Sequence, residues 1–316
     1  MGTRPGRAYP LFTGTPADLH VRSAWASFAR AFIRGMTVTP VHAPLTLSPA
    51  RRVLLHAGDY DVVASEHPAD VRAAQRLRFE VFRAEPGYSD AIGDDGTGLD
   101  ADRFDDFCDH LLIRHLPTGR LAGCARVLPP PRAIAAGGWY SASEFDLTEI
   151  EAIGPQTVEM GRAVVDPEHR SGAVTGLLWT AVLSYLEQGG YRYLMGCVSV
   201  PLESDPGRGR ELRGIRDLAL SQYAALWTAH PYRRVEVDGA GLDAVEPPAK
   251  AALPPLLRGY VRLGARVCGE PAFDEVFDVG DFLTVLDREQ GDPRYLARLR
   301  GALARLSPAD GEASQR

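Results

Sequence analysis

Two charged residues lie within a segment whose other residues are typical of a buried strand. Residues 157–165 are TVEMGRAVV, and apart from Glu159 and Arg162 they are mostly apolar and compatible with β-structure. A buried charge needs either an oppositely charged partner or a chemical role. The sequence therefore predicts that Glu159 and Arg162 form either a structural ion pair or the charged part of a functional site.

A turn and a long amphipathic helix follow this strand directly. The loop at 166–172 is DPEHRSG, the expected helix begins at Ser171 or Gly172, and two glycines end it at 189–190. A helix that begins just after a strand presents free backbone N–H groups and the positive end of its dipole, which suits a phosphate-bearing ligand. Arg170 adds a positive charge, so we expect Arg170, Ser171 and Gly172 to contact such a group.

The remaining elements must hold this strand–turn–helix unit in place. Residues 110–116 and 120–128 predict a hairpin around the turn PTG, and three prolines at 129–131 end its second strand. The order of strand, helix, meander and strand–turn–helix–strand indicates an α+β protein with a mixed, mostly antiparallel central sheet flanked by helices. Further strands are expected at 61–64, 193–200, 267–273 and 281–286, helices at 68–83, 208–227 and 254–263, a final helix from 295, and an irregular segment at 137–147.

Composition and charge exclude several classes of protein. The 316 residues carry a net charge of −6 and have a pI near 5.8, which argues against a nucleic-acid-binding protein that depends on a basic surface. The four cysteines are far apart and match no metal-binding spacing, so we expect reduced core thiols and no metal site. No apolar run reaches the ~20 residues that span a bilayer, and no secretory signal is apparent, which favours a cytoplasmic location.

The first 50 residues differ from the rest and are expected to form a basic extension before a single domain at 51–300 and a tail at 301–316. They contain five arginines against one aspartate. Within them, residues 23–36 predict a short amphipathic helix with aromatic side chains on one face and arginines on the other. This helix either makes a reversible, peripheral contact with a membrane surface or packs on the protein itself.

Two charged segments each permit a structural and a functional interpretation. Residues 89–109 contain eight aspartates, which form either a solvated loop or a lid that attracts a cationic substrate, and no calcium-binding loop fits them. The helix at 208–227 places four arginines on its outer side, which are either simply solvated or form a basic docking face. These arginines are Arg208, Arg210, Arg213 and Arg216.

Six ordered segments within residues 61–295 carry a family resemblance. They are LRFEVF at 77–82, DADRFDDFCDHLLI at 100–113, GWYSASEFDL at 138–147, VEMGRAVVDPEHRSGAV at 158–174, YRYLMGCVSVP at 191–201 and LPPLLRGYVRLGARVCGEPAFD at 253–274. Together they resemble the ornithine–acyl carrier protein N-acyltransferases and, more distantly, the N-acyl amino acid synthases and acyl-homoserine lactone synthases, all similar to the GNAT acetyltransferase fold. The lactone synthases do not share the segments around Trp139 and from Leu253 onward, so the ornithine branch is favoured.

The resemblance implies an acyltransferase that moves a (3-hydroxy)fatty acyl group from acyl carrier protein to the α-amine of ornithine and gives lyso-ornithine lipid. The turn at 170–176 has one glycine in its tight part, where GNAT enzymes have an R/Q-x-x-G-x-G/A loop for pyrophosphate. This difference fits the single phosphodiester of acyl carrier protein better than acyl-CoA, and the resemblance implies no other cofactor. The alternatives are another amino acid acceptor, a lactone synthase-like enzyme, or a non-enzymatic acyl carrier or membrane-binding module.

The expected reaction assigns chemical roles to several residues. An amine attacks a thioester without a protein nucleophile, but it must first lose a proton, and Glu159 is the candidate base. Backbone N–H groups near 160–164 would stabilise the oxyanion. Asp105 is a further candidate base, and His110 is either a second base or a hydrogen-bonded core histidine.

The other charged residues are expected to bind the substrate. Arg126 and Arg162 would either bind the carboxylate of the amino acid or orient Glu159 and Asp105. The remaining pocket residues, which the lactone synthases share, are Arg78, Phe82 and Asp102.

Overall fold

The computed structural model describes residues 51–85, 96–170, 172–204 and 207–291. The expected N-terminal extension with its helix at 23–36, the final helix from 295, the tail at 301–316 and Ser171 all lie outside these residues.

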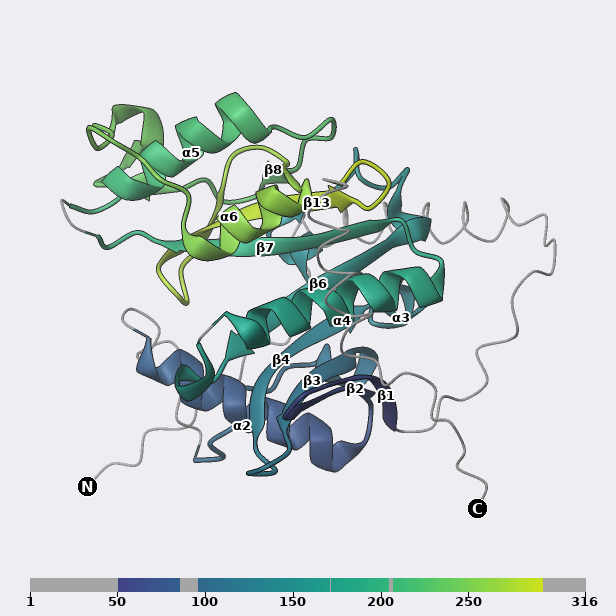
Figure 1. Ribbon diagram of the computed structural model, residues 1–316. Helices are drawn as coiled ribbons and strands as arrows, with labels where there is room; N and C mark the ends of the chain where they lie inside the picture. Colours follow the sequence, from purple (N-terminus) through teal and green to yellow (C-terminus); the bar gives the residue numbers. More distant parts are fainter. Residues whose placement is uncertain (1–50, 86–95, 171, 205–206, 292–316) are drawn as a thin grey trace, which may run out of the picture.

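A nine-stranded mixed sheet forms the centre of the described chain (Figure 1). Its strands follow the order β1-β2-β3-β4-β6-β7-β13-β11, and β12 pairs with β13. Every pair is antiparallel except β6 and β7, which are parallel, so the prediction of a mixed, mostly antiparallel sheet is confirmed. The strands of this sheet are β1 (Arg51–Ala57), β2 (Tyr60–Ser65), β3 (Asp109–His115), β4 (Leu121–Leu128), β6 (Thr157–Val165), β7 (Tyr193–Pro201), β11 (Arg266–Val267), β12 (Ala272–Asp274) and β13 (Val279–Asp287). Two small sheets pair β5 (Phe145–Asp146) with β8 (His230–Pro231) and β9 (Glu236–Val237) with β10 (Ala240–Gly241).

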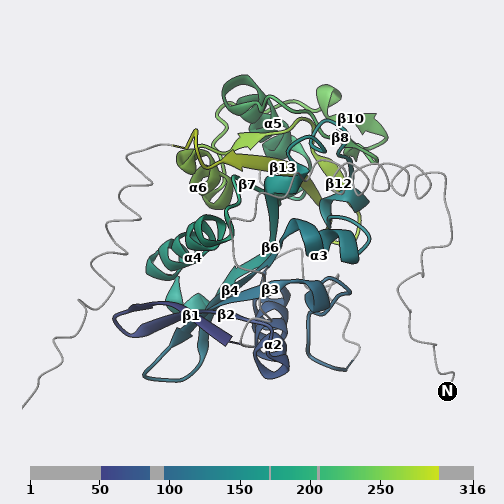
Figure 2. The same ribbon diagram turned by 90° about the vertical axis from the view of Figure 1, so that its right-hand side faces the viewer.

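Helices cover both faces of this sheet (Figure 2). α4, α5 and α6 lie on one face, where their apolar side chains share a core with alternate residues of β3, β4 and β6. α2 and α3 lie on the other face. The bounds are α2 (Pro68–Ala84), α3 (Pro130–Ala135), α4 (Ala173–Gly189), α5 (Arg210–Tyr223) and α6 (Pro255–Leu263). Within the described ranges, no helix has both the length and the apolar character needed to span a bilayer.

Most predicted elements form at the expected places. β1 and the short strands β5, β8, β9 and β10 were not predicted. The prolines end β4 as predicted, but α3 was not predicted. It forms directly after β4, because Pro130 and Pro131 occupy its first turn, where proline needs no N–H partner. The single strand expected at 267–273 is divided into β11 and β12, since Gly269 between them has a φ of 123°, which is incompatible with a strand.

The parallel pair β6 and β7 separates part of the way along. Only residues 157–159 of β6 pair with β7. On its other side, the register with β4 shifts between Cys124 and Arg126, so that Arg162 and Ala163 together oppose one residue and form a bulge. Arg162 has a φ of 51°, which is unusual for a residue other than glycine and is typical of strained positions at functional sites. The two strands therefore diverge beyond Glu159 and leave a gap in the sheet.

Candidate active site

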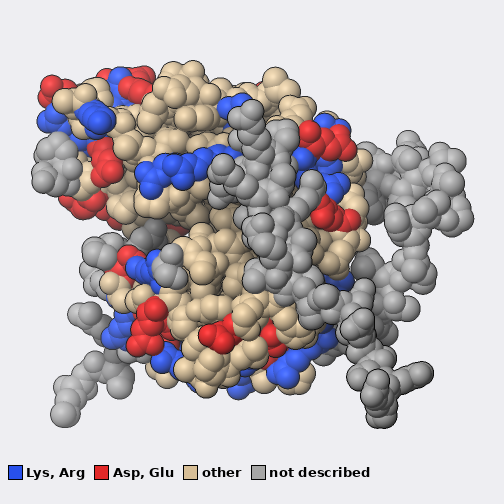
Figure 3. Space-filling model, in the orientation of Figure 1, with Lys and Arg blue, Asp and Glu red and all other residues tan. Residues whose placement is uncertain are grey.

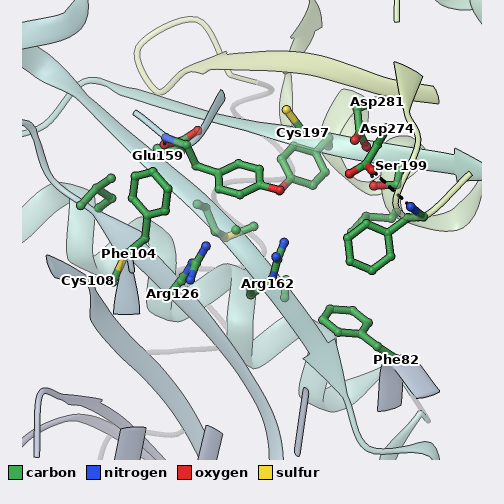
Figure 4. Close-up of a pocket in the computed structure, with 18 residues that line it drawn as sticks. Phe82, Phe104, Cys108, Arg126, Glu159, Arg162, Cys197, Ser199, Asp274 and Asp281 are labelled. Atoms are coloured by element: carbon green, nitrogen blue, oxygen red, sulfur yellow. Dashed lines mark hydrogen bonds between the residues drawn. The ribbon is translucent and has the colours of Figure 1, made fainter. Parts of the chain in front are cut away.

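A cleft of ≈ 1080 Å³, counting space open to solvent, lies where β6 and β7 diverge (Figure 4). Its walls come from β4, β6, β7, β13, α2 and α6. Four predicted site residues line it, namely Phe82, Arg126, Glu159 and Arg162, whereas Arg78, Asp102, Asp105 and His110 are not among its lining residues.

The carboxylate of Glu159 is buried and held by three donors. Its Oε2 accepts a hydrogen bond from the Tyr140 N–H at 2.6 Å, and its Oε1 accepts one from the Ser141 N–H at 2.8 Å and another from the Ser141 hydroxyl. Burial raises the pKa of Glu159, and these hydrogen bonds oppose the rise only in part. A carboxylate has about four acceptor positions, so one position on Oε2 remains for a proton from a substrate.

A charge-balanced cluster of three arginines and three aspartates lies beside the cleft. Asp105 accepts hydrogen bonds from Arg78 at 2.9 Å and from Arg126 at 3.0 Å. Asp102 accepts from both terminal nitrogens of Arg126, at 2.6 and 2.7 Å, so each of these nitrogens already donates to an aspartate. Burial alone would raise the pKa of Asp105, but Arg78 and Arg126 outweigh burial and hold this pKa far below its usual range. Asp105 therefore stays ionised and is better suited to orienting the arginines than to accepting a proton.

Arg162, the third arginine of the cluster, is held less tightly. Its Nε lies 3.3 Å from Asp100 and its Nη2 lies 3.7 Å from Asp102, and its guanidinium carbon lies 5.3 Å from the centre of the Tyr140 ring. No ion pair within the described residues joins Arg162 to Glu159. The bulge accounts for this, because an extra residue changes the direction in which the following side chains point. Arg162 thus lines the cleft with looser carboxylate contacts than Arg126 has.

His110 supports Asp105 from outside the lining of the cleft. Its ring is completely buried, and Nε2 donates a hydrogen bond to the backbone carbonyl of Asp105 at 3.1 Å. Burial lowers the pKa of His110, so the ring is neutral at physiological pH. Of its two predicted roles, this geometry favours the hydrogen-bonded core histidine. Arg78 is also buried behind the cleft, whereas Phe82, one turn further along α2, lines it.

The start of α4 is the part of the site expected to meet a phosphate. Gly172 precedes the helix with a φ of 89°, and no side chain among the described residues caps the first turn. Arg170 pairs with Glu85 at 2.5 Å and so reaches the end of α2. The N–H groups of the first turn are therefore the feature of this region that remains available to an anion.

The acidic run at 89–109 and the arginines around α5 were each expected either to be simply solvated or to have a function. Asp100, Asp102 and Asp105 of the acidic run bind arginines, so the interpretation as a merely solvated loop is wrong for these three residues. The arginines around α5 are also paired, each with at least one carboxylate between 2.5 and 3.4 Å away, and the expected basic face is neutralised.

Three carboxylates that no sequence pattern indicated lie close together, and two of them, Asp274 and Asp281, line the cleft. Oxygens of Glu144, Asp274 and Asp281 lie within 4.8 Å of one another, and Figure 4 shows Asp274 and Asp281 together beside Ser199. Asp281 is only 4% exposed and accepts a hydrogen bond from the Ser199 hydroxyl at 2.5 Å. The thiol of Cys197 donates to Glu144 at 3.6 Å. None of the ion pairs in the described part of the chain includes these carboxylates, which we call the acidic trio.

No ion pair within the described residues neutralises the acidic trio, although the charge of Arg162 favours the ionised form of Asp281. Burial raises the pKa of Asp281 to about 6, and burial together with Asp281 and Asp274 raises the pKa of Glu144 well above its usual range. Buried charges are normally paired or hold a ligand. The arrangement is therefore suited to a cation, either an ammonium group or a metal ion.

The bulged strand, the gap in the sheet and the helix that begins after it define an acyltransferase of the GNAT class. Residues 77–180 match the family described as "Acetyltransferase (GNAT) domain". The chain is 32% identical over 257 residues to the L-ornithine N(alpha)-acyltransferase of Brucella abortus, covering 78% of this chain and 90% of that protein. It is 30% identical over 237 residues to the enzyme of the same name from Rhodobacter capsulatus, covering 73% and 90%. The chain belongs to the L-ornithine Nα-acyltransferase family, as the six segments predicted.

Among solved structures, the CoA-dependent acyl-homoserine lactone synthase BjaI is 15% identical and aligns over 77% of this chain and 85% of its own, with a TM-score of 0.45.

Proposed function

We propose that this enzyme transfers a long (3-hydroxy)fatty acyl group from the pantetheine thioester of acyl carrier protein to the α-amine of ornithine, which gives lyso-ornithine lipid. The observation that carries the proposal is the acidic trio, because it places carboxylates without an ion-pair partner among the described residues at an acyl-transfer cleft. The names of the relatives, which specify a diamino acid, support the same acceptor.

The charges of the cleft match those of ornithine. The acidic trio would hold the side-chain ammonium, and Arg162 would bind the carboxylate. Arg126 is less suited to that task, since Asp102 and Asp105 already occupy its terminal nitrogens. With both ends of the amino acid held, the α-amine is left to react. An uncharged amino acid of the same length would leave the acidic trio without a partner and would bind poorly.

Donor and acceptor would approach the gap from opposite faces of the sheet. Cys197, Ser199 and Asp281 share the face that carries α2 and α3, together with the core residues Met195 and Leu283 on the same strands. α4 and α6 lie on the other face, where Tyr260 lines the cleft. The acceptor would therefore bind on the first face, and the thioester would enter along α4 and α6 and meet the amine between β6 and β7.

The chemistry needs a base, an oxyanion site and a leaving thiol. The α-ammonium would give one proton to Oε2 of Glu159, and the raised pKa of this carboxyl favours that transfer. The amine nitrogen then attacks the thioester carbon, a C–N bond forms, the C–S bond breaks, and the thiolate takes up the second nitrogen proton. Beyond Glu159 the N–H groups of β6 that face β7 are not used in a ladder with it, so they are available to the oxyanion.

A carrier protein is favoured as donor over acyl-CoA. The first turn of α4 can receive one phosphate through its N–H groups, but Arg170 is engaged with Glu85 and the glycine-rich pyrophosphate loop is not present in the sequence. The single phosphodiester of a protein donor needs fewer N–H donors and less positive charge at the start of α4 than a pyrophosphate does.

The test compares ornithine with norvaline, which lacks the side-chain amine, in the wild-type enzyme with an acylated carrier protein. We expect kcat/KM for ornithine to exceed that for norvaline by ~100-fold or more, which corresponds to one desolvated charge interaction of about 3 kcal/mol. Equal values would overturn the proposed acceptor. Addition of a chelator distinguishes an ammonium group from a metal ion as the occupant of the acidic trio. Turnover that stops on chelation would assign the acidic trio to a metal ion.

A further inference from the structure

The outer face of α6 carries arginines that have no partner within the described chain. Arg258 and Arg262 lie one turn apart and are exposed, and no ion pair or hydrogen bond of either side chain occurs among the described residues. Figure 3 shows Lys and Arg atoms in a row over the position of α6, whereas positive and negative atoms are mixed over α5. The arginines around α5 are neutralised by neighbouring carboxylates, whereas Arg258 and Arg262 on α6 remain available to a partner.

The opposite side of the same helix forms part of the cleft. Tyr260 lines the cleft from a buried position and packs edge-on against Trp179 of α4, with ring centres 4.6 Å apart. Leu256, at the start of α6, also lines the cleft and is 42% exposed. Arg258 is therefore only two residues from a side chain at the cleft mouth, on the face by which the donor would enter.

We propose that the outer face of α6, made by Arg258 and Arg262 with Leu256 at its cleft end, is the docking surface for an acidic carrier protein that delivers the acyl chain. The proposal rests on the proposed function, since it assumes a thioester donor borne by a protein. The chain has a net charge of −6, so an acidic partner would be repelled by much of its surface. An unpaired pair of arginines beside the cleft mouth gives such a partner a favourable place to bind and orients its thioester toward the gap.

α2 offers a matched control for this surface. Arg72 and Arg76 have the same spacing, are exposed, and also have no side-chain partner within the described residues. They precede Phe82, the residue of α2 that lines the cleft, by six and ten residues, which is roughly 9 and 15 Å along the helix. The same charge reversal can therefore be made on a helix of the same protein at a distance from the cleft.

The experiment measures kcat and KM for the double variants R258E/R262E and R72E/R76E with two donors, an acylated carrier protein and the same acyl chain on free pantetheine. We expect R258E/R262E to raise KM for the carrier about tenfold or more, to leave the rate with acyl-pantetheine unchanged, and to lose the salt dependence of the wild-type KM. We expect R72E/R76E to stay within about twofold of wild type for both donors.

Three results with the variants would overturn the docking surface. They are an unchanged KM for the carrier, an equal increase in the α2 control, and an equal loss with both donors, which would mean that the α6 change had damaged the cleft. Wild-type enzyme that acylates ornithine from pantetheine but not from the carrier would refute the docking surface and leave the acceptor assignment intact. Absence of ornithine acylation from either donor would refute the proposed function itself.

Discussion

Replacement of Asp281 by asparagine should stabilise the protein while it removes activity toward ornithine. Asp281 is almost fully buried in the acidic trio, and its neighbours within the described chain include no ion-paired cation. Asparagine keeps the size of the side chain and an oxygen for the Ser199 hydroxyl, and its amide can donate to the remaining carboxylates. The substitution thus removes an unfavourable charge without opening a cavity.

The magnitude follows from the pKa of Asp281. Burial raises this pKa from 3.8 to about 6. The folded state therefore binds the proton more tightly than the unfolded state, and ionisation destabilises the fold increasingly as pH rises from about 4 to 6 and fully above 6. At 1.36 kcal/mol per unit, the cost at neutral pH is at most roughly 3 kcal/mol. For a domain of this size that is a rise in Tm of up to ~6–12 °C for Asp281→Asn.

The assay is thermal unfolding of wild type and variant at pH 4 and pH 7.5, combined with kcat/KM for ornithine. We expect nearly equal Tm values at pH 4, a higher Tm for the variant at pH 7.5, and a loss of kcat/KM of ~10²-fold. Asp287 on the same strand is the matched control, because Arg192 binds it at 2.9 and 2.7 Å and its pKa is lowered, so Asp287→Asn should lower Tm at neutral pH. A lower Tm for Asp281→Asn at pH 7.5, or unchanged use of ornithine, would refute the reasoning.

Three further outcomes follow from the charges of the site. The ratio of kcat/KM for ornithine to that for norvaline should fall as pH drops from 7.5 to 5.5, since Asp281, with a pKa of about 6, becomes protonated; a flat ratio would contradict this. Glu159→Gln should lower kcat by about 10²–10⁴-fold. Ser141→Ala should lower kcat far less, because it removes one hydrogen bond but keeps the carboxylate. Equal effects of the two substitutions would make Glu159 a structural residue. Asp105→Asn should cost about 3–5 kcal/mol in a denaturant titration, because Arg78 and Arg126 lose their shared partner, and a change below ~1 kcal/mol would contradict that role.

The sequence identified the charged residues within the buried strand, but it did not identify the residues that they contact. Glu159 and Arg162 were recognised as charges in a buried strand, and the strand, the turn and the helix after it form as expected. The bulge at Arg162 could not be foreseen, because it depends on the register with β4, a contact between distant parts of the chain. Without the bulge, nothing indicated that Glu159 would bind Tyr140 and Ser141 rather than Arg162.

The acidic trio was missed for a related reason. Glu144, Asp274 and Asp281 come from three separate parts of the chain. Asp274 and Asp281 lie on the paired strands β12 and β13, and Glu144 lies just before β5, where it meets Cys197 of β7. One signal was nevertheless present. Glu144 and Asp274 lie within the segments at 138–147 and 253–274, which support the resemblance to the ornithine enzymes and which the lactone synthases do not share. Segments that distinguish related families are where residues that select the acceptor are expected.

The central claim is that the side-chain ammonium of ornithine is held in the acidic trio while its α-amine reacts. The most direct measurement is NMR and tandem mass spectrometry of the product formed by the purified enzyme from an acylated carrier protein and ornithine, with free carrier thiol measured in the same reaction. We expect Nα-acylornithine with a free side-chain amine, and one carrier thiol released for each product molecule. A product acylated on the side-chain amine, or thiol release that does not depend on ornithine, would contradict it.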